Sequence, residues 1–73
     1  MNMLEQYIQP GWTTEPITDP KDLAECKKYG LNADEMIKVH GNRDCYGDTA
    51  PIRPVLWFKD KWESAVKDGY YMA

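Results

Sequence analysis

The strongest constraint on this fold is a segment that carries both the start and the stop signals of a short helix. Asp19 is a good N-cap residue, and Pro20 follows it at the first helical position, where proline is favoured. Gly30 can end the helix in the left-handed conformation, and Leu31 can fold back as the apolar partner of this cap. The sequence therefore predicts a helix from Pro20 to Tyr29. Its buried stripe would consist of Leu23, Cys26 and Tyr29.

The chain that follows favours a second helix. Asn32 can cap it, Glu35 stands three residues later at capping-box spacing, and Gly41 can stop it. Apolar and half-apolar side chains recur at i, i+3, i+4 and i+7, at Ala33, Met36, Ile37 and His40. A strand through residues 36–40, MIKVH, is the alternative, because this run also alternates. We favour the helix.

The expected helical pair, Pro20 to His40, loosely resembles a helix-turn-helix. In CKKYGLNADEM a small residue precedes the turn glycine by four positions, and apolar residues follow it at the spacing of that motif. The resemblance implies a nucleic-acid-binding regulator. However, the second helix would begin with Asp34 and Glu35 and would offer only Lys38 as a base, so it would repel phosphate. Nucleic-acid binding is therefore an alternative and not the leading hypothesis.

The remaining elements are read from short-range patterns. Residues 3–8 fit one helical turn or a short strand, and prolines keep the rest of residues 1–18 an extended arm. IRPVLWFKD is typical of a strand, and DKWESAVKDG of a helix that Asp60 caps and Gly69 stops. The last residues, YYMA, would form a terminal strand or a flap on the core. The sequence thus predicts one compact α+β domain over residues 1–73: a helical pair, then a short strand or hairpin, then a C-terminal helix.

The stretch VHGNRDCYGD, residues 39–48, collects a histidine, an arginine, a cysteine, a tyrosine and two aspartates. Cys45 with His40 as its base would be a nucleophile pair. The same stretch is rich in residues that turns select for backbone reasons, namely Gly41, Asn42, Asp44, Gly47 and Asp48. We therefore interpret it as a connecting loop and expect no catalytic residue.

A metal site would need Cys26, His40 and Cys45, together with a carboxylate such as Asp44. Their spacing, Cys-x13-His-x4-Cys, lacks the closely spaced pairs that are typical of zinc sites. We therefore expect neither a metal nor a cofactor. Two cysteines are too few for a disulfide scaffold, so we expect two reduced thiols, with Cys26 in the core.

The length of 73 residues leaves little room for both a core and a deep cleft, because a chain of this size buries about 60% of its unfolded surface. The net charge is −3, from 9 basic and 12 acidic residues, and the bases form no stripe. This disfavours binding to a phosphate backbone. No apolar run is long enough to span a membrane, and the N-terminus lacks a signal-peptide pattern. We therefore expect a non-enzymatic protein in the cytoplasm.

The chain has more aromatic residues than a core of this size can bury. Exposed tryptophan and tyrosine, together with arginine, are enriched at protein interfaces. The sequence therefore predicts a surface that binds another protein. The candidate residues of this surface are Trp12, Arg43, Arg53, Trp57, Trp62, Tyr70 and Tyr71.

Short, acidic and aromatic-rich chains without a catalytic set are typical of accessory inhibitors from bacterial viruses, which block a host enzyme or defence complex. By this analogy of size and composition, the leading hypothesis is a protein-binding inhibitor. One alternative is the nucleic-acid-binding regulator described above. The other is a homo-oligomer that sequesters a small ligand, with Arg53, Trp57 and Trp62 lining a shared pocket.

Overall fold

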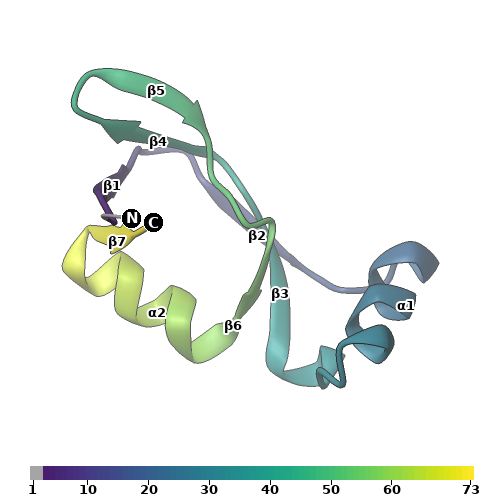
Figure 1. Cartoon of the computed structure of the whole chain (residues 1–73). Coiled ribbons are helices and arrows are strands. Elements are labelled where there is room, and N and C mark those ends of the chain that lie inside the picture. The colour runs from purple at the N-terminus through teal and green to yellow at the C-terminus, as the bar shows by residue number, and fades with distance from the viewer. Residues whose placement is uncertain (1–2) are drawn as a thin grey trace.

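The computed structural model describes residues 3–73, and this part of the chain is mostly β-structure (Figure 1). Within it, seven short strands form two antiparallel sheets, accompanied by two helices and one 3-10 turn. In chain order the elements are β1 (Glu5–Ile8), β2 (Thr13–Pro16), α1 (Pro20–Lys28), η1 (Ala33–Glu35), β3 (Met36–His40), β4 (Asn42–Cys45), β5 (Asp48–Pro51), β6 (Leu56–Phe58), α2 (Lys59–Asp68) and β7 (Tyr70–Met72).

The two sheets share one long two-stranded ribbon. β1 and β2 follow each other along one segment, β3 and β4 along another, and the two segments pair antiparallel. Four residues separate Ile8 from Thr13, whereas two separate their partners Arg43 and His40. The first segment therefore carries two extra residues at the junction, and such an excess bends a ribbon as a bulge does. The strand order is β5-β4-β1-β7 on one side of the junction and β2-β3-β6 on the other.

Gly41 lies at this junction, where the two segments approach most closely. A Cβ atom at Gly41 would lie 2.8 Å from Trp12 Cβ and 3.3 Å from Ile52 Cδ1. The Gly41 carbonyl oxygen accepts a hydrogen bond from the backbone N of Ile52 at 2.9 Å. The absence of a side chain at Gly41 thus allows Trp12 and Ile52 to meet over the ribbon.

Two small cores lie on opposite faces of β3. The core under α1 consists of Ile17, Cys26 and Met36. The core under α2 consists of Val39, Ile52, Trp62 and Ala65. Met36 and Val39 are three positions apart along β3, so their side chains point to opposite faces. The two helices therefore cover opposite faces of the sheet β2-β3-β6, and Figure 1 shows α1 and α2 on either side of it.

The first predicted helix is confirmed as α1, which ends one residue earlier than expected. Asp19 caps it by accepting a hydrogen bond from the backbone N of Lys21 at 2.8 Å. Gly30 has a left-handed φ of +70°, and the backbone N of Leu31 donates to the Cys26 carbonyl oxygen at 2.8 Å. These are features of a Schellman motif. Of the predicted stripe Cys26 is buried, whereas Leu23 and Tyr29 are exposed.

The prediction of a second helix is wrong. Residues 33–35 form a single 3-10 turn, which Asn32 caps by accepting a hydrogen bond from the backbone N of Asp34 at 3.0 Å, and residues 36–40 form the strand β3. β3 is the central strand of its sheet, so β2 and β6 pair with its backbone on both sides. The β-branched side chains of Ile37 and Val39 suit this position. Because β3 is a strand, no helix-turn-helix-like pair forms over Pro20 to His40.

The predicted arrangement of the fold is therefore also wrong. The described residues form a small domain built on two sheets, and not a helical pair followed by a strand or hairpin. The arm expected over residues 1–18 contributes β1 and β2, while residues 1 and 2 lie outside the described part. The loop expected over residues 39–48 instead contains the end of β3, the whole of β4 and the turn into β5.

The C-terminal strand, helix and terminal strand have the secondary structure that the sequence predicts. β6, α2 and the terminal strand β7 are present, and Gly69 ends α2 with a left-handed φ of +86°. The predicted cap of α2 is wrong, because Phe58 occupies the N-cap position and makes no side-chain hydrogen bond there. β6 leads directly into α2, which leaves no turn before the helix in which Asp60 could act as its cap.

Replacing Asp19 with alanine should lower the free energy of unfolding by about 1 kcal/mol, because the backbone N of Lys21 loses its acceptor. Asp19→Asn keeps an acceptor oxygen and should lose less than half of this amount. Urea unfolding monitored by circular dichroism measures both variants. Equal stability of Asp19→Ala and the parent would contradict the capping role.

Gly41→Ala should lower the free energy of unfolding by about 1–3 kcal/mol, because the new methyl group would be forced against the Trp12 backbone and side chain. It should also displace the indole N–H resonance of Trp12. Gly47→Ala is the control, since Gly47 has open space around it and its positive φ alone adds strain. An unmoved Trp12 resonance in Gly41→Ala would show that the junction does not depend on this contact.

Candidate protein-binding surface

One face of the sheet β5-β4-β1-β7 is open. Residues that pair across antiparallel strands share a face, so the strand register assigns each residue to one side. The core under α2 lies on the inner face, which carries Ile8 and Tyr71, and α1 packs on the other sheet. Within residues 3–73 no helix covers the opposite side, which we call the outer face. Its strand residues are Glu5, Tyr7, Asn42, Asp44, Thr49, Pro51, Tyr70 and Met72.

Three tyrosines gather at the outer face. Tyr7 pairs with Tyr70 across β1 and β7, and their ring centroids are 5.7 Å apart. Tyr46 lies in the turn after β4, two positions beyond Asp44, the residue that pairs with Tyr7. Tyr46 is 80% exposed, Tyr7 is 46% exposed, and the neighbouring Met72 is equally exposed. Strands that are already paired thus present an aromatic surface to solvent.

The turn that presents Tyr46 is strained. Tyr46 and Gly47 connect β4 to β5 with φ values of +51° and +87°. Positive φ at both central positions is typical of a type I′ hairpin, in which Asn-Gly is preferred. A tyrosine in the left-handed region costs about 1–2 kcal/mol. Arg43 Nη1 donates to the Asp48 carbonyl oxygen at 2.6 Å and holds the strands together beside the turn. A strained and exposed aromatic residue is a reason to look for function here.

The strands of the outer face carry acids and no base. Glu5 and Asp44 are the charged residues that the register assigns to it, whereas Arg43 lies on the inner face. The Tyr7 hydroxyl donates a hydrogen bond to the Glu5 carboxylate. This hydrogen bond, together with the nearby charge of Glu5, raises the pKa of Tyr7 above its ordinary value. With Glu5 and Asp44 beside the tyrosines, the surface is both aromatic and negatively charged.

The predicted partner-binding aromatics are divided between the core and the surface. Trp62 is 3% exposed, and the ring centroids of Trp12 and Trp57 each lie 5.2 Å from it in edge-on contacts. Tyr71 continues this cluster with an edge-on contact to Trp57 at 5.0 Å. The cluster belongs to the core under α2, where Trp62 has no surface to share with a ligand or a partner. Tyr70 is the predicted residue that lies on the outer face.

Neither predicted arginine lies on the outer face. Arg43 is held against Asp48, and Arg53 is exposed in the connection between β5 and β6. Apart from Tyr70, sequence reasoning predicted no residue of this surface as a binding residue, and it missed the acidic and aromatic ones in particular, namely Glu5, Tyr7, Asp44 and Tyr46. A signal for Tyr46 was present, because CYGD places a glycine-containing pair between two short runs and so indicates a tight hairpin.

A groove of about 280 Å³ runs between β7 and α2. Three of the predicted residues, Trp57, Tyr70 and Tyr71, contribute to its lining. Ala65 of α2 adds to the apolar part of the lining, and the polar part includes Lys61 of the same helix. The groove therefore meets the outer face at the strand β7.

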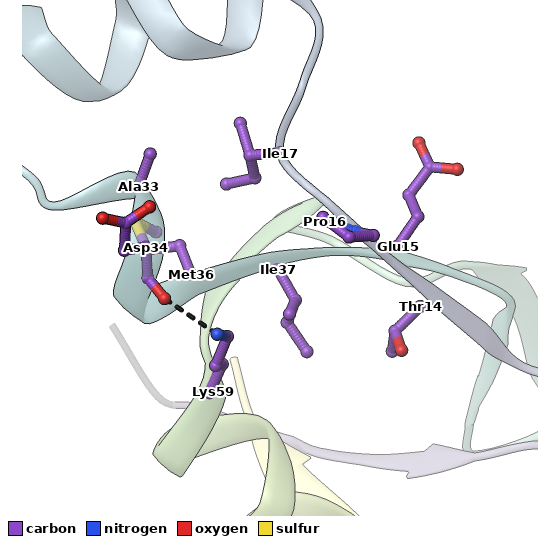
Figure 2. Close-up of a pocket in the computed structure, with 9 residues that line it drawn as sticks. All are labelled: Thr14, Glu15, Pro16, Ile17, Ala33, Asp34, Met36, Ile37 and Lys59. Atoms are coloured by element: carbon purple, nitrogen blue, oxygen red, sulfur yellow. Dashed lines mark hydrogen bonds between the residues drawn. The ribbon is translucent and has the colours of Figure 1, made fainter.

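A second groove, of about 320 Å³, lies at the end of the sheet β2-β3-β6 (Figure 2). Pro16 and Ile37 provide apolar lining, and Glu15 and Lys59 provide charge. The Lys59 ammonium donates to the Asp34 carbonyl oxygen at 2.8 Å. The groove therefore combines apolar lining with one charge of each sign.

The reactive side chains of residues 39–48 have separate partners. His40 Nε2 lies 3.5 Å from Glu15 Oε1, whereas Cys45 Sγ accepts a hydrogen bond from Gln6 Nε2 at 3.5 Å. Cys26 is buried in the core under α1. Within residues 3–73 no three histidine, cysteine, aspartate or glutamate side chains are grouped so that they could hold a metal ion. The arrangement thus brings no nucleophile–base pair together at His40 and Cys45.

Comparisons with protein-family models, with curated proteins and with solved structures find no match to this chain. In the part of the chain that the structure describes, no helix is long and apolar enough to cross a membrane. The outer face and the two grooves described above are the features of residues 3–73 that could contact a partner.

The two cysteines should differ in reactivity. Cys26 is 1% exposed, whereas Cys45 is half-buried, so a thiol reagent should label Cys45 at least about tenfold faster in the native protein. In denaturant the two rates should become equal. Mass spectrometry of the digested adducts gives the rate at each site. Equal and fast labelling of the native protein would contradict the position of Cys26 in the core.

Proposed function

We propose that the protein is a non-enzymatic module of the cytoplasm that binds another protein through its outer face. The observation that carries this proposal is the group of Tyr7, Tyr46 and Tyr70 on a sheet face that no described helix covers. Tyrosine supplies a large contact area with little loss of side-chain entropy, and it is frequent among the residues that dominate binding energy.

The inhibitory role is the more specific part of the proposal. A module of this size can block a larger protein by covering its site, and needs no chemistry of its own. By analogy of size and composition with accessory inhibitors of bacterial viruses, the partner would be a host enzyme or defence complex. The cytoplasmic location draws support from Cys26 and Cys45, which form no disulfide with each other, as is usual for cysteines in a reducing compartment.

The test compares three immobilised proteins as baits in a lysate of the cells in which the protein is made. The baits are the parent, a triple variant with Tyr7→Ala, Tyr46→Ala and Tyr70→Ala, and the control Tyr29→Ala. Tyr29 is a matched control, because it is 63% exposed but lies at the end of α1, outside the outer face.

A partner should be captured by the parent and the Tyr29 control and lost with the triple variant. Removal of each interface tyrosine is expected to cost about 2 kcal/mol, or roughly thirtyfold in affinity. Circular dichroism confirms that each bait is folded. Capture that is the same for all three baits would contradict the assignment of the outer face.

A further inference from the structure

The strand β7 is one of the two edges of the sheet that carries the outer face, and β5 is the other. Leu4 and Ala73 exchange two backbone hydrogen bonds, with N–O distances of 2.8 and 3.0 Å, and the backbone N of Ile8 donates to the Gly69 carbonyl oxygen at 3.0 Å. Along each strand of an antiparallel pair, residues that hydrogen-bond to the partner strand alternate with residues whose N–H and C=O groups point away from it. Leu4 and Ile8 both hydrogen-bond to the segment of β7. By this alternation, Gln6 is the residue between them that also bonds to it, and its partner is Tyr71.

The backbone N–H and C=O groups of Tyr70 and Met72 therefore point away from β1. Within residues 3–73, β7 pairs with no strand other than β1, so these four groups face an unoccupied edge. Such a row of donors and acceptors is a template for one more strand.

The position of β7 is fixed from its inner side. Gln6 is 7% exposed, and its amide nitrogen donates to the carbonyl oxygens of Leu4 at 3.3 Å and Ala73 at 3.4 Å. The ladder and this amide thus hold the last residues of the chain in register. An incoming strand would meet an edge that is already ordered, which lowers the entropy lost on binding.

Of the three other edge strands, β2 and β5 are protected in ways that β7 is not, whereas β6, with the sequence LWF, also lacks a charged residue and a proline. β2 contains Glu15 and ends at Pro16, and β5 begins with Asp48 and ends at Pro51. Charge and proline are the usual means by which an edge avoids pairing with other chains. β7, with the sequence YYM, has neither a charged residue nor a proline.

The groove beside this edge is suited to the side chains of an added strand. Trp57, Ala65 and Tyr71 line it on the inner side of the sheet, and Lys61 and Asp68 add one charge of each sign. An added strand would alternate its side chains between this groove and the outer face. The inward residues would meet apolar surface, and the outward residues would extend the row that contains Tyr70 and Met72.

We propose that the partner docks by adding one extended segment to β7, with apolar side chains in the groove and cationic side chains on the outer face. The cationic preference follows from Glu5 and Asp44, which the register places on this face without a base, and from the tyrosine rings, which attract ammonium and guanidinium groups. This inference rests on the proposed protein-binding function and specifies its mode.

The probe is a seven-residue peptide of alternating arginine and valine, blocked at both ends, which is titrated into the ¹⁵N-labelled protein to millimolar concentration. The amide resonances of Tyr70 and Met72 should move downfield and become protected from solvent exchange. Two matched peptides are the controls. One carries N-methyl groups on alternate amides and the other has glutamate in place of arginine, and both should bind at least about tenfold more weakly.

A variant of β7 tests the edge itself. Met72→Pro removes an outward N–H group and no hydrogen bond to β1, so proline is tolerated at this position as on other edges. It should keep the fold by circular dichroism and weaken peptide binding about tenfold, because a carbonyl oxygen of the added strand loses its N–H donor. Met72→Leu keeps the N–H group and should bind like the parent. If Met72→Pro unfolds, the N-methylated peptide decides the same question.

These experiments distinguish the proposal that the partner adds a strand to β7 from the proposal that it binds the outer face. Unmoved amides of Tyr70 and Met72 at millimolar peptide would overturn the edge proposal. Loss of the partner on tyrosine replacement would then still support the outer face. A dimeric mass of the free protein, with the Tyr70 and Met72 amides already protected, would show that a second copy occupies the edge and would also overturn the proposal.

Discussion

The close approach of Gly41 to Trp12 is the constraint on which the rest of the structure depends. At this point one ribbon passes from the sheet β5-β4-β1-β7 to the sheet β2-β3-β6, and a side chain at Gly41 would be forced against Trp12 Cβ. The bend brings Val39, Ile52 and Trp62 into one core. A chain this short can bury little surface in a flat sheet, so folding the ribbon over itself supplies the burial that it needs.

What the sequence reveals about this fold is limited to features encoded within a few residues. The Asp19 cap bonds to Lys21, and the stop at Gly30 bonds Leu31 to Cys26, so each signal acts within a few residues. The helix α1 is found where these two signals predict it. The cap at Asn32 is also real, yet the chain after it becomes β3 because β2 and β6 pair with both of its sides. Those partners lie about twenty residues away in either direction. A capping box contains no information about them, so a local pattern favoured the wrong structure.

The sequence predicts an exposed aromatic surface, but it does not identify most of the residues that form this surface. The number of aromatic residues indicates that some must be exposed, but it does not tell which ones, and of the predicted aromatics the half-buried Tyr70 is the one on the outer face. Trp12, Trp57 and Trp62 pack edge to edge in the core under α2, whereas Tyr7 and Tyr46 stay at the surface. Tyrosine keeps its hydroxyl hydrated there, while the larger apolar area of tryptophan favours burial. Which side of a strand faces the core depends on its register with partner strands that lie far away in the sequence, and no short pattern reports that register.

The outer face and the free edge meet on the same strand, and this gives the proposed interface its physical logic. Backbone groups of Tyr70 and Met72 can bind an extended chain of almost any sequence. An edge strand alone would therefore bind many peptides without sequence specificity. The side chains of the same two residues belong to the outer face, next to Glu5 and Tyr7. A strand added to β7 must therefore place every second side chain beside tyrosines and acids, and the others against Trp57. The edge would supply affinity through the backbone, and the two flanking surfaces would supply the selection of sequence.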